Sequence, residues 1–251
     1  MNVPASTGTV VIDLDGVVWL AGTPLPGAST AVTLLRQAGH PIIFATNNSS
    51  PTTAMFVERL GRAGIDAAPD EIISAADAAA FAVPRGSRTL VLGDIGVHEA
   101  AAARSLEESE EGCEAVIVGW SRSFDYDTIA RASNAVRSGA TFVATNDDPT
   151  HPTPQGLLPG TGAFVAAVAT AAEQVPLIAG KPGQPMVDLI RDRSSATEFV
   201  IGDRPSTDGR LAEQLGVPFG LVVSEATPVT DLTQALQASS LLGVVESMLG
   251  A

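Results

Sequence analysis

The sequence predicts an α/β protein with a mostly parallel sheet, because short runs of β-branched residues alternate with alanine-rich helical patterns. Residues 9–12 form a continuous apolar run, as expected of a strand that is buried on both faces of a sheet. The apolar spacing over residues 28–38 predicts a helix that ends at Gly39, a residue suited to helix C-termini. Residues 41–45 and 55–63 predict the next strand and helix.

Five further apolar runs predict strands at residues 89–92, 115–118, 141–144, 199–201 and 220–223. More than 130 residues separate Asn48 from Lys181, far more than a crossover between parallel strands requires. Three of the predicted strands fall within this stretch. We therefore expect a second α/β module at residues 79–178, inserted into a core formed by residues 1–78 and 179–251.

The composition restricts the class of protein. The chain has 251 residues and a formal net charge of −14, so a nucleic-acid backbone is not an expected partner. There is no run of roughly 18 apolar residues, and the first residues have neither the charges nor the apolar segment of a signal peptide. We expect a cytoplasmic protein that does not bind membranes. The single cysteine, Cys113, excludes an internal disulfide and is expected to be a buried or inert thiol.

One lysine stands among thirteen arginines. Lys181 lies in the segment Gly-Lys-Pro at 180–182. An ammonium is a compact point charge, whereas a guanidinium is a wide planar fork, so a crowded anionic site can require lysine. Taken alone, the observation is equally consistent with a chance surface lysine in an arginine-biased chain.

Polar clusters follow three of the predicted strands and the apolar run at residues 176–179. They are Asp-Leu-Asp-Gly at 13–16, Thr-Asn-Asn-Ser at 46–49, the lysine segment, and Gly-Asp-Arg-Pro-Ser-Thr-Asp at 202–208. Each one alone is also ordinary turn or helix-cap chemistry. In open parallel sheets, however, loops at the carboxyl ends of strands converge on ligand sites, and all four clusters follow apolar runs. The sequence therefore predicts one polar site.

Three of these side chains would repel one another if they converged. Two carboxylates about 4 Å apart repel by about 4 kcal/mol at an effective dielectric constant near 20, so Asp13, Asp15 and Asp203 would have to bind a proton or a cation. Oxygen ligands favour Mg²⁺, which binds phosphate oxygens as well. With Lys181 as a further cation, the cluster has the groups that phosphoryl transfer requires.

The motifs resemble those of the haloacid dehalogenase superfamily of phosphatases. Over nearly all of its length, the chain is similar to the NagD-like subfamily (IIA), also called the p-nitrophenyl phosphatase or phosphoglycolate phosphatase-like group. The motifs are Asp-Leu-Asp-Gly-Val-Val-Trp, Thr-Asn-Asn-Ser, Ala-Thr-Asn-Asp-Asp, Pro-Gly-Thr-Gly-Ala-Phe, Gly-Lys-Pro and Gly-Asp-Arg-x-x-Thr-Asp. The resemblance implies a Rossmann-like, doubly wound parallel-sheet core with an inserted α/β cap domain of the C2 type.

The resemblance also implies chemical roles for the carboxylates. Asp13 would be the nucleophile that forms an aspartyl-phosphate, and Asp15 would be the general acid and then the general base. Asp13, the backbone carbonyl of Asp15 and Asp203 would bind Mg²⁺. Asp208 would orient a metal-bound water or the lysine.

The remaining implied roles concern the substrate. Thr46, the backbone amide of Asn47 and Lys181 would bind the phosphate. A cap would select the substrate, and the candidate residues for this selection end a predicted strand; they are Asn146, Asp147, Asp148 and His151. The sequence Asn-Asp-Asp-Pro is also ideal for a tight turn, and the two interpretations are weighted equally.

Three other features have competing interpretations. Residues 159–163 could be a nucleotide-binding glycine loop, but they lack the full glycine spacing, so a helix start is favoured. Trp19 could contact the substrate, but packing is favoured. Ser206, Gly209 and Glu225 depart from the residues that are frequent at these positions of the family, and their effect is open.

The favoured function is that of a Mg²⁺-dependent phosphatase of small phosphomonoesters. Its substrate could be phosphoglycolate, glycerol phosphate, pyridoxal phosphate, a sugar phosphate or a nucleotide. The alternatives are a phosphate-binding or sensing module without significant turnover, and a phosphomutase; Asp15 argues against a dehalogenase, which needs no acid for the leaving group. The expected partner is a small phosphorylated metabolite, and a homodimer is possible.

Overall fold

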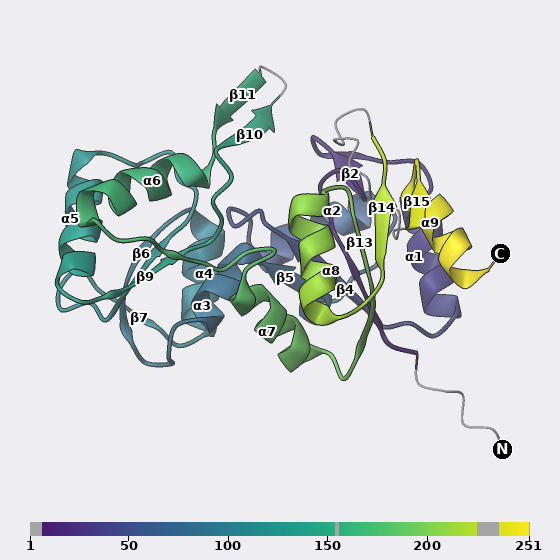
Figure 1. Cartoon of the computed structure of the whole chain (residues 1–251), viewed down its shortest axis with the longest axis horizontal. Helices are drawn as coiled ribbons and strands as arrows, with labels where there is room; N and C mark the ends of the chain where they lie inside the picture. Colours follow the sequence, from purple (N-terminus) through teal and green to yellow (C-terminus); the bar gives the residue numbers. More distant parts are fainter. Residues whose placement is uncertain (1–6, 154–155, 225–235, 251) are drawn as a thin grey trace. The chain divides into compact units, whose positions relative to one another are not determined.

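The computed structural model describes residues 7–153, 156–224 and 236–250 and has the predicted α/β architecture (Figure 1). The chain divides into two compact units, which are described separately. The first unit comprises Met1–Ala45, Phe56–Ile73 and Ile190–Ala251; the second comprises Thr46–Met55 and Ser74–Leu189. The second unit thus contains the whole predicted insert, 79–178, together with residues 46–55, 74–78 and 179–189. The limits 79–178 for the cap itself stay a prediction.

The first unit is built on a parallel sheet. Within the described residues it has six strands in the order β15-β14-β13-β1-β4-β5. Strands β1 and β13 lie side by side at its centre, with Val10 opposite Phe199 and Ile12 opposite Ile201. The strands are β1 (Thr9–Ile12), β4 (Ile42–Thr46), β5 (Ile72–Ser74), β13 (Thr197–Gly202), β14 (Phe219–Val222) and β15 (Leu236–Ala238).

Helices cover the sheet because its strands are apolar on both faces. Val10, Ile12 and Phe44 share a buried cluster with residues of α1 (Ala28–Gln37), α2 (Thr53–Arg62) and α9 (Leu241–Leu249). Val11, on the opposite face of β1, is only 1% exposed, so this face is covered as well. The remaining elements are the hairpin β2 (Trp19–Leu20) and β3 (Thr23–Pro24), the short helix Pro69–Glu71, the π-helical turn Pro205–Gly209 and helix α8 (Arg210–Leu215). Helix α7 (Gln184–Arg193) begins in the second unit and ends in the first.

The second unit has its own parallel sheet. Its described residues form five strands in the order β12-β9-β8-β6-β7. Alternate residues of β6, β8 and β9 pack with α5 and α6 in a separate buried cluster. The elements are β6 (Arg88–Leu92), β7 (Glu107–Glu108), β8 (Ala115–Val118), β9 (Thr141–Ala144), β12 (Leu177–Ile178), α3 (Ala75–Phe81), α4 (Ile95–Ala103), α5 (Tyr126–Arg137) and α6 (Thr161–Ala172). Strands β10 (Thr150–Thr153) and β11 (Gly156–Pro159) form an antiparallel hairpin next to α6 (Figure 1).

Hydrogen bonds explain why residues 46–55 belong to the second unit. The hydroxyl of Ser50 donates to Asp94 at 2.6 Å, and the backbone N–H of Thr53 donates to Glu99 at 2.7 Å. The backbone N–H of Gly96 also donates to the carbonyl of Ser50, at 2.9 Å. The loop after β4 is therefore fixed by the start of α4, which lies more than forty residues further along the chain.

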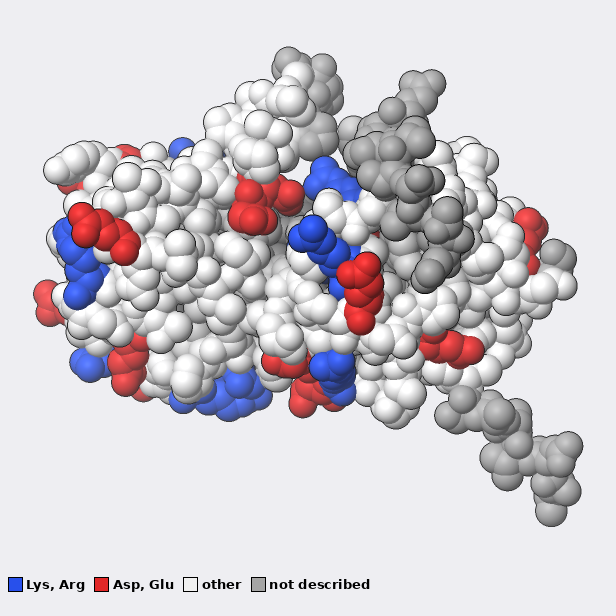
Figure 2. All heavy atoms as spheres, in the orientation of Figure 1, with Lys and Arg blue, Asp and Glu red and all other residues white. Residues whose placement is uncertain are grey.

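The surface is acidic with interspersed basic side chains. On the face drawn in Figure 2, Lys and Arg side chains lie among Asp and Glu side chains and form no continuous patch. Among the helices of the described residues, none combines the length and the apolar character that crossing a membrane requires.

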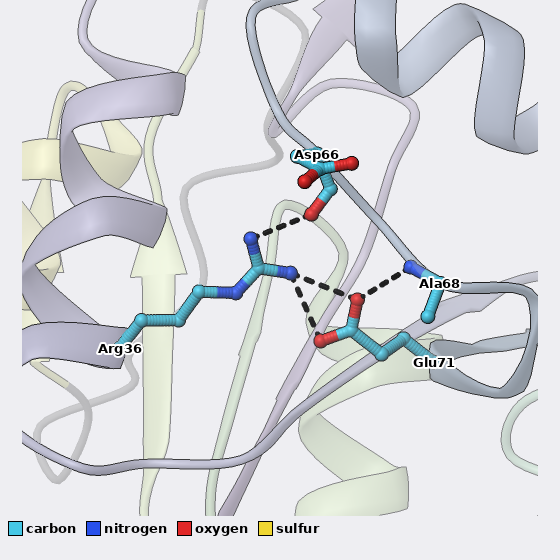
Figure 3. Close-up of polar contacts among 4 residues, drawn as sticks. All are labelled: Arg36, Asp66, Ala68 and Glu71. Carbon is cyan, nitrogen blue, oxygen red and sulfur yellow. Dashed lines mark hydrogen bonds and ion pairs between the residues drawn. The ribbon is translucent and has the colours of Figure 1, made fainter.

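An arginine stabilises the edge of the first sheet (Figure 3). Arg36, in α1, donates from Nη1 to the backbone carbonyl of Asp66 at 2.6 Å. Its Nη2 contacts both carboxylate oxygens of Glu71, at 2.9 and 2.8 Å. Glu71 also accepts the backbone N–H of Ala68 at 2.9 Å. Since β5 begins directly after Glu71, this network links α1 to the edge strand.

We expect Arg36→Ala to lower the free energy of unfolding of the first unit by about 1 kcal/mol, because it removes a partly buried ion pair together with a bond to a carbonyl. Urea unfolding followed by circular dichroism measures the change. The matched control is Arg62→Ala, whose pair with Glu58 is mostly exposed, with an expected loss of about 0.5 kcal/mol or less. Equal effects of the two substitutions would contradict the role given to Arg36.

Candidate active site

The first polar cluster lies in a tight turn after β1. The backbone N–H of Asp13 donates to the carbonyl of Ile201 at 2.9 Å, which continues the ladder between β1 and β13 by one residue. The chain then turns, because the N–H groups of Val17, Val18 and Trp19 all bond the carbonyl of Leu14, at 3.3, 2.9 and 3.2 Å. The side chain of Asp13 is therefore held at the carboxyl end of the central strand.

Three aspartates come together at this end of the sheet. Asp13, Asp203 and Asp208 each place one carboxylate oxygen within 4.8 Å of the others. Asp13 and Asp208 are 8% and 1% exposed, and Asp203 is half-buried. Two of the three predicted metal ligands, Asp13 and Asp203, are thus adjacent. The side chain of Asp208 lies in the same group, where the sequence predicted an orienting role.

The protein backbone makes room for these carboxylates at two glycines. Gly16 has a φ of +88°, and a Cβ atom there would lie 2.3 Å from Oδ2 of Asp203. A Cβ atom at Gly202 would lie 2.2 Å from Cγ of Asp208. Larger residues would displace both side chains. The result is a compact set of carboxylate oxygens from adjacent strands, which suits a hard divalent cation such as Mg²⁺.

Asp208 also stabilises the turn that follows β13. Its Oδ2 accepts the backbone N–H of Arg204 at 3.1 Å and lies 3.4 Å from the hydroxyl of Thr207. The turn Pro205–Gly209 is π-helical and leads directly into α8. Gly209, whose effect the sequence leaves open, lies inside this turn and is buried. Ser206 is exposed there, and nothing in the structure explains its choice. Glu225 lies outside the described residues.

Asp15 is exposed, and its side chain is bonded to a buried ring. Oδ1 of Asp15 accepts the indole N–H of Trp19 at 2.9 Å. Trp19 is 3% exposed and belongs to the main cluster of the first unit, so the prediction that it packs is confirmed. The sequence analysis missed its hydrogen bond to Asp15. A signal was available, because a buried indole N–H needs an acceptor and Asp15 is four residues away.

The lysine segment is held by an asparagine of the second unit. Oδ1 of Asn47 accepts the backbone N–H of Lys181 at 2.7 Å, and Nδ2 of Asn47 donates to the backbone carbonyl of Lys181 at 3.0 Å. Lys181 is 4% exposed, which excludes the alternative of a chance surface lysine. Thr46 is also buried, and its hydroxyl oxygen accepts the backbone N–H of Asn48 at 3.1 Å.

The four predicted specificity residues have different surroundings. Asn146 is buried and donates from Nδ2 to the backbone carbonyl of Asn47 at 2.8 Å, while its Oδ1 accepts the N–H of Asp148 at 3.2 Å. Asp147 is exposed, and Asp148 is half-buried. Asn146 therefore makes the bonds of a structural turn, as the alternative interpretation predicted. A role of these residues in substrate selection stays a prediction.

His151 lies in the hairpin β10–β11, beside a tryptophan. Its Nδ1 is 3.1 Å from the backbone carbonyl of Pro159, and that carbonyl also accepts the indole N–H of Trp120 at 3.1 Å. The two rings meet edge to face with centroids 5.4 Å apart. Because a carbonyl only accepts, Nδ1 of His151 is the donor in this contact.

Two further sequence predictions are confirmed. The glycine-rich segment 159–163 is a helix start, since α6 begins at Thr161 and Gly162 donates its N–H to Asp148. Cys113 is half-buried, and burial raises the pKa of its thiol above the usual value, as expected of an inert cysteine. Its Sγ lies 3.3 Å from the carbonyl of Ser109.

Comparisons with known proteins identify the family of the chain. Residues 10–107 match the model of a family described as haloacid dehalogenase-like hydrolase, and residues 178–249 match a second model described as HAD-hydrolase-like. The acid sugar phosphatase of Staphylococcus aureus is 33% identical over 206 residues, which are 79% of each chain. The chain belongs to the haloacid dehalogenase-like hydrolases.

Other members of the family show the same fold. The D-glycerol 3-phosphate phosphatase of Mycobacterium tuberculosis is 33% identical over 90% of the chain, and the chain spans 65% of the length of that relative. A crystal structure of the M. tuberculosis glycerol phosphate phosphatase, in complex with magnesium, has a TM-score of 0.84 at 31% identity and covers 95% of this chain and 76% of its own.

The resemblance to the NagD-like group is confirmed as well. A p-nitrophenyl phosphatase from Archaeoglobus fulgidus has a TM-score of 0.87 at 27% identity, with 97% of this chain and 100% of that chain covered. The predicted doubly wound core with an inserted α/β cap is therefore the fold of this family member.

We expect Asn47→Ala to loosen the lysine segment, because the backbone N–H and carbonyl of Lys181 both lose their side-chain partner. Hydrogen–deuterium exchange at the amide of Lys181 should become roughly tenfold faster or more. The control is Asn134→Ala in α5 of the same unit, which removes a hydrogen bond accepted from the neighbouring Arg137 and should leave the Lys181 amide unchanged. If the Lys181 amide exchanges no faster in Asn47→Ala, the role of Asn47 in holding the lysine segment is refuted.

Proposed function

We propose that the chain is a Mg²⁺-dependent phosphatase that hydrolyses small phosphomonoesters through an aspartyl-phosphate. The observation that carries the proposal is the cluster of Asp13, Asp203 and Asp208 at the carboxyl ends of β1 and β13. Three carboxylates with oxygens within 4.8 Å need a cation for stability, and phosphate is a natural further ligand of such a cation. Membership of a hydrolase family whose similar members are phosphatases supports the same conclusion.

In the proposed first step, a carboxylate oxygen of Asp13 attacks the phosphorus atom of the ester. A bond forms between this oxygen and phosphorus as the bond from phosphorus to the leaving oxygen breaks. Asp15 gives its proton to the leaving oxygen, so the alcohol departs neutral. The surroundings of the two residues support Asp13 as the nucleophile and Asp15 as the acid, because Asp13 is buried beside two other carboxylates whereas Asp15 is exposed.

The proposed second step returns the enzyme to its starting state. Asp15, now a carboxylate, takes a proton from a water molecule as the water oxygen attacks phosphorus. The bond between Asp13 and phosphorus breaks, and inorganic phosphate is released. Asp15 thereby regains the proton that it lost in the first step.

The proposed binding roles follow the same scheme. Asp13, Asp203 and the backbone carbonyl of Asp15 would hold Mg²⁺, which when bound supplies positive charge that stabilises the transferring phosphoryl group. Asp208 would orient the groups around the metal, as its bond to the turn after β13 suggests. Thr46, the backbone amide of Asn47 and Lys181 would bind the phosphate.

Substrate selection is proposed to lie in the inserted cap, residues 79–178, through Asn146, Asp147, Asp148 and His151. Of the candidate substrates, glycerol phosphate and sugar phosphates are favoured by the similarity to the D-glycerol 3-phosphate phosphatase of M. tuberculosis and the acid sugar phosphatase of S. aureus. We further propose a cytoplasmic enzyme whose partner is a small phosphorylated metabolite.

Asp13→Asn should abolish turnover of p-nitrophenyl phosphate and glycerol 3-phosphate, because an amide oxygen is a poor nucleophile. The expected loss is on the order of 10⁴-fold, with an unchanged circular dichroism spectrum. Asp192→Asn, at an exposed position of α7, is the control and should retain activity. Chelation of Mg²⁺ should abolish the activity of the parent protein. Substantial hydrolysis by Asp13→Asn would refute the nucleophile, and chelator-insensitive hydrolysis would refute the metal.

Lys181→Arg should lower kcat/KM by about 100-fold or more, because the side chain is 4% exposed and the wide guanidinium cannot replace a compact ammonium in a crowded site. Steady-state kinetics with the same two substrates measure the loss. Lys181→Met, which removes the charge and keeps a similar length, should be at least as slow. Activity of Lys181→Arg close to that of the parent would show that the charge alone matters or that Lys181 takes no part.

A further inference from the structure

The turn after β1 connects one tryptophan to Asp15 through both backbone and side chain. The backbone N–H of Gly16, next to Asp15, donates to the carbonyl of Trp19 at 2.7 Å, and Asp15 and Trp19 pair as an isolated parallel bridge. The indole N–H of Trp19 donates to Oδ1 of Asp15 at 2.9 Å. Trp19 thus contacts both the main chain next to Asp15 and the carboxyl group of Asp15.

The two side chains differ in their freedom to move. Asp15 is exposed, and an exposed aspartate changes rotamer readily. Trp19 is 3% exposed and packs with Leu14, Val17 and Val18 in the main cluster of the first unit. A ring in a close-packed core has one orientation, so its N–H points in a fixed direction. The core therefore offers the exposed carboxyl group a hydrogen-bond donor of fixed direction.

We propose that Trp19 is a positioning residue for the general acid, which it holds in the orientation needed for proton transfer. This inference rests on the proposed function, because it takes Asp15 as the acid. A general acid must lie within hydrogen-bond reach of the leaving oxygen at the moment when the bond to phosphorus breaks. Trp19 keeps its own proton throughout, and the proton that moves belongs to Asp15.

The competing explanation is that Trp19 only fills space in the core. The two explanations differ in how they depend on the leaving group. An alkoxide is a poor leaving group and needs the proton of Asp15, whereas p-nitrophenolate departs readily without it. A misplaced acid slows alkyl esters more than aryl esters, but a general loss of folded enzyme slows both by the same factor.

The kinetic test compares kcat/KM for glycerol 3-phosphate and p-nitrophenyl phosphate, because this ratio reports steps up to departure of the leaving group. Trp19→Phe keeps an aromatic ring and deletes the N–H. It should lose roughly tenfold more activity on glycerol 3-phosphate than on p-nitrophenyl phosphate. Val18→Ala, in the same turn and cluster, is the matched control for packing and should lower both values equally.

Asp15→Asn separates the two proposals. It should show the same preference for the aryl ester, with a loss of about 10²–10⁴-fold on glycerol 3-phosphate. If Asp15→Asn slows both esters equally, the acid assignment within the proposed function fails. If Asp15→Asn discriminates and Trp19→Phe does not, the positioning role alone is overturned.

A second measurement needs neither activity nor metal. The chain has only two tryptophans, Trp19 and Trp120, so a ¹⁵N-labelled indole spectrum contains two N–H signals. Asp15→Ala should move the Trp19 signal upfield, as expected for loss of a hydrogen bond, and leave the Trp120 signal, bonded to the carbonyl of Pro159, in place. A Trp19 signal that is unchanged in Asp15→Ala would overturn the inference even if Trp19→Phe does not fold.

Discussion

The structure depends on the electrostatics of carboxylates that meet at the end of a parallel sheet. Strands β1 and β13 are neighbours, and each carries an aspartate just past its last residue, so Asp13 and Asp203 have to be close. Asp208 joins them because the turn after β13 folds back onto the strand end. Bringing like charges together opposes folding unless a cation compensates them. The fold therefore supplies a site that a cation completes, and this need connects the architecture with the chemistry.

Glycine and main-chain bonds make this convergence possible. The space beside Asp203 and Asp208 exists because Gly16 and Gly202 have no Cβ atoms that would enter it. The two hydrogen bonds from the Asn47 side chain likewise go to the main-chain N–H and carbonyl of Lys181, and the ammonium-bearing side chain takes no part in these two bonds. In both places the backbone is fixed close to a charged side chain. Such positioning by a fixed backbone is typical of sites built on the ends of rigid strands.

The elements that the sequence predicted well are those with continuous apolar runs. The strands at 9–12, 115–118 and 141–144 begin and end where expected, because each is a short apolar run that is buried over most or all of its length. Short edge strands and hairpins carry no such signal; β7 has two glutamates and β5 has three residues. The residues of the site were found because carboxylates after apolar strands are unusual. Their partners were not found, since Asn47 and Lys181 are 134 positions apart.

The pairing of Trp19 with Asp15 shows where sequence reasoning can be extended. Packing accounts for the burial of the Trp19 ring, as the sequence predicted. An indole also carries one N–H donor, which an apolar core cannot satisfy. Its acceptor is the carboxyl group of Asp15, which is exposed to solvent. An exposed acid is free to meet a substrate, yet freedom of the side chain lowers the fraction of time that it is aligned. A buried donor resolves this conflict, because it orders the carboxyl group while leaving it accessible to solvent.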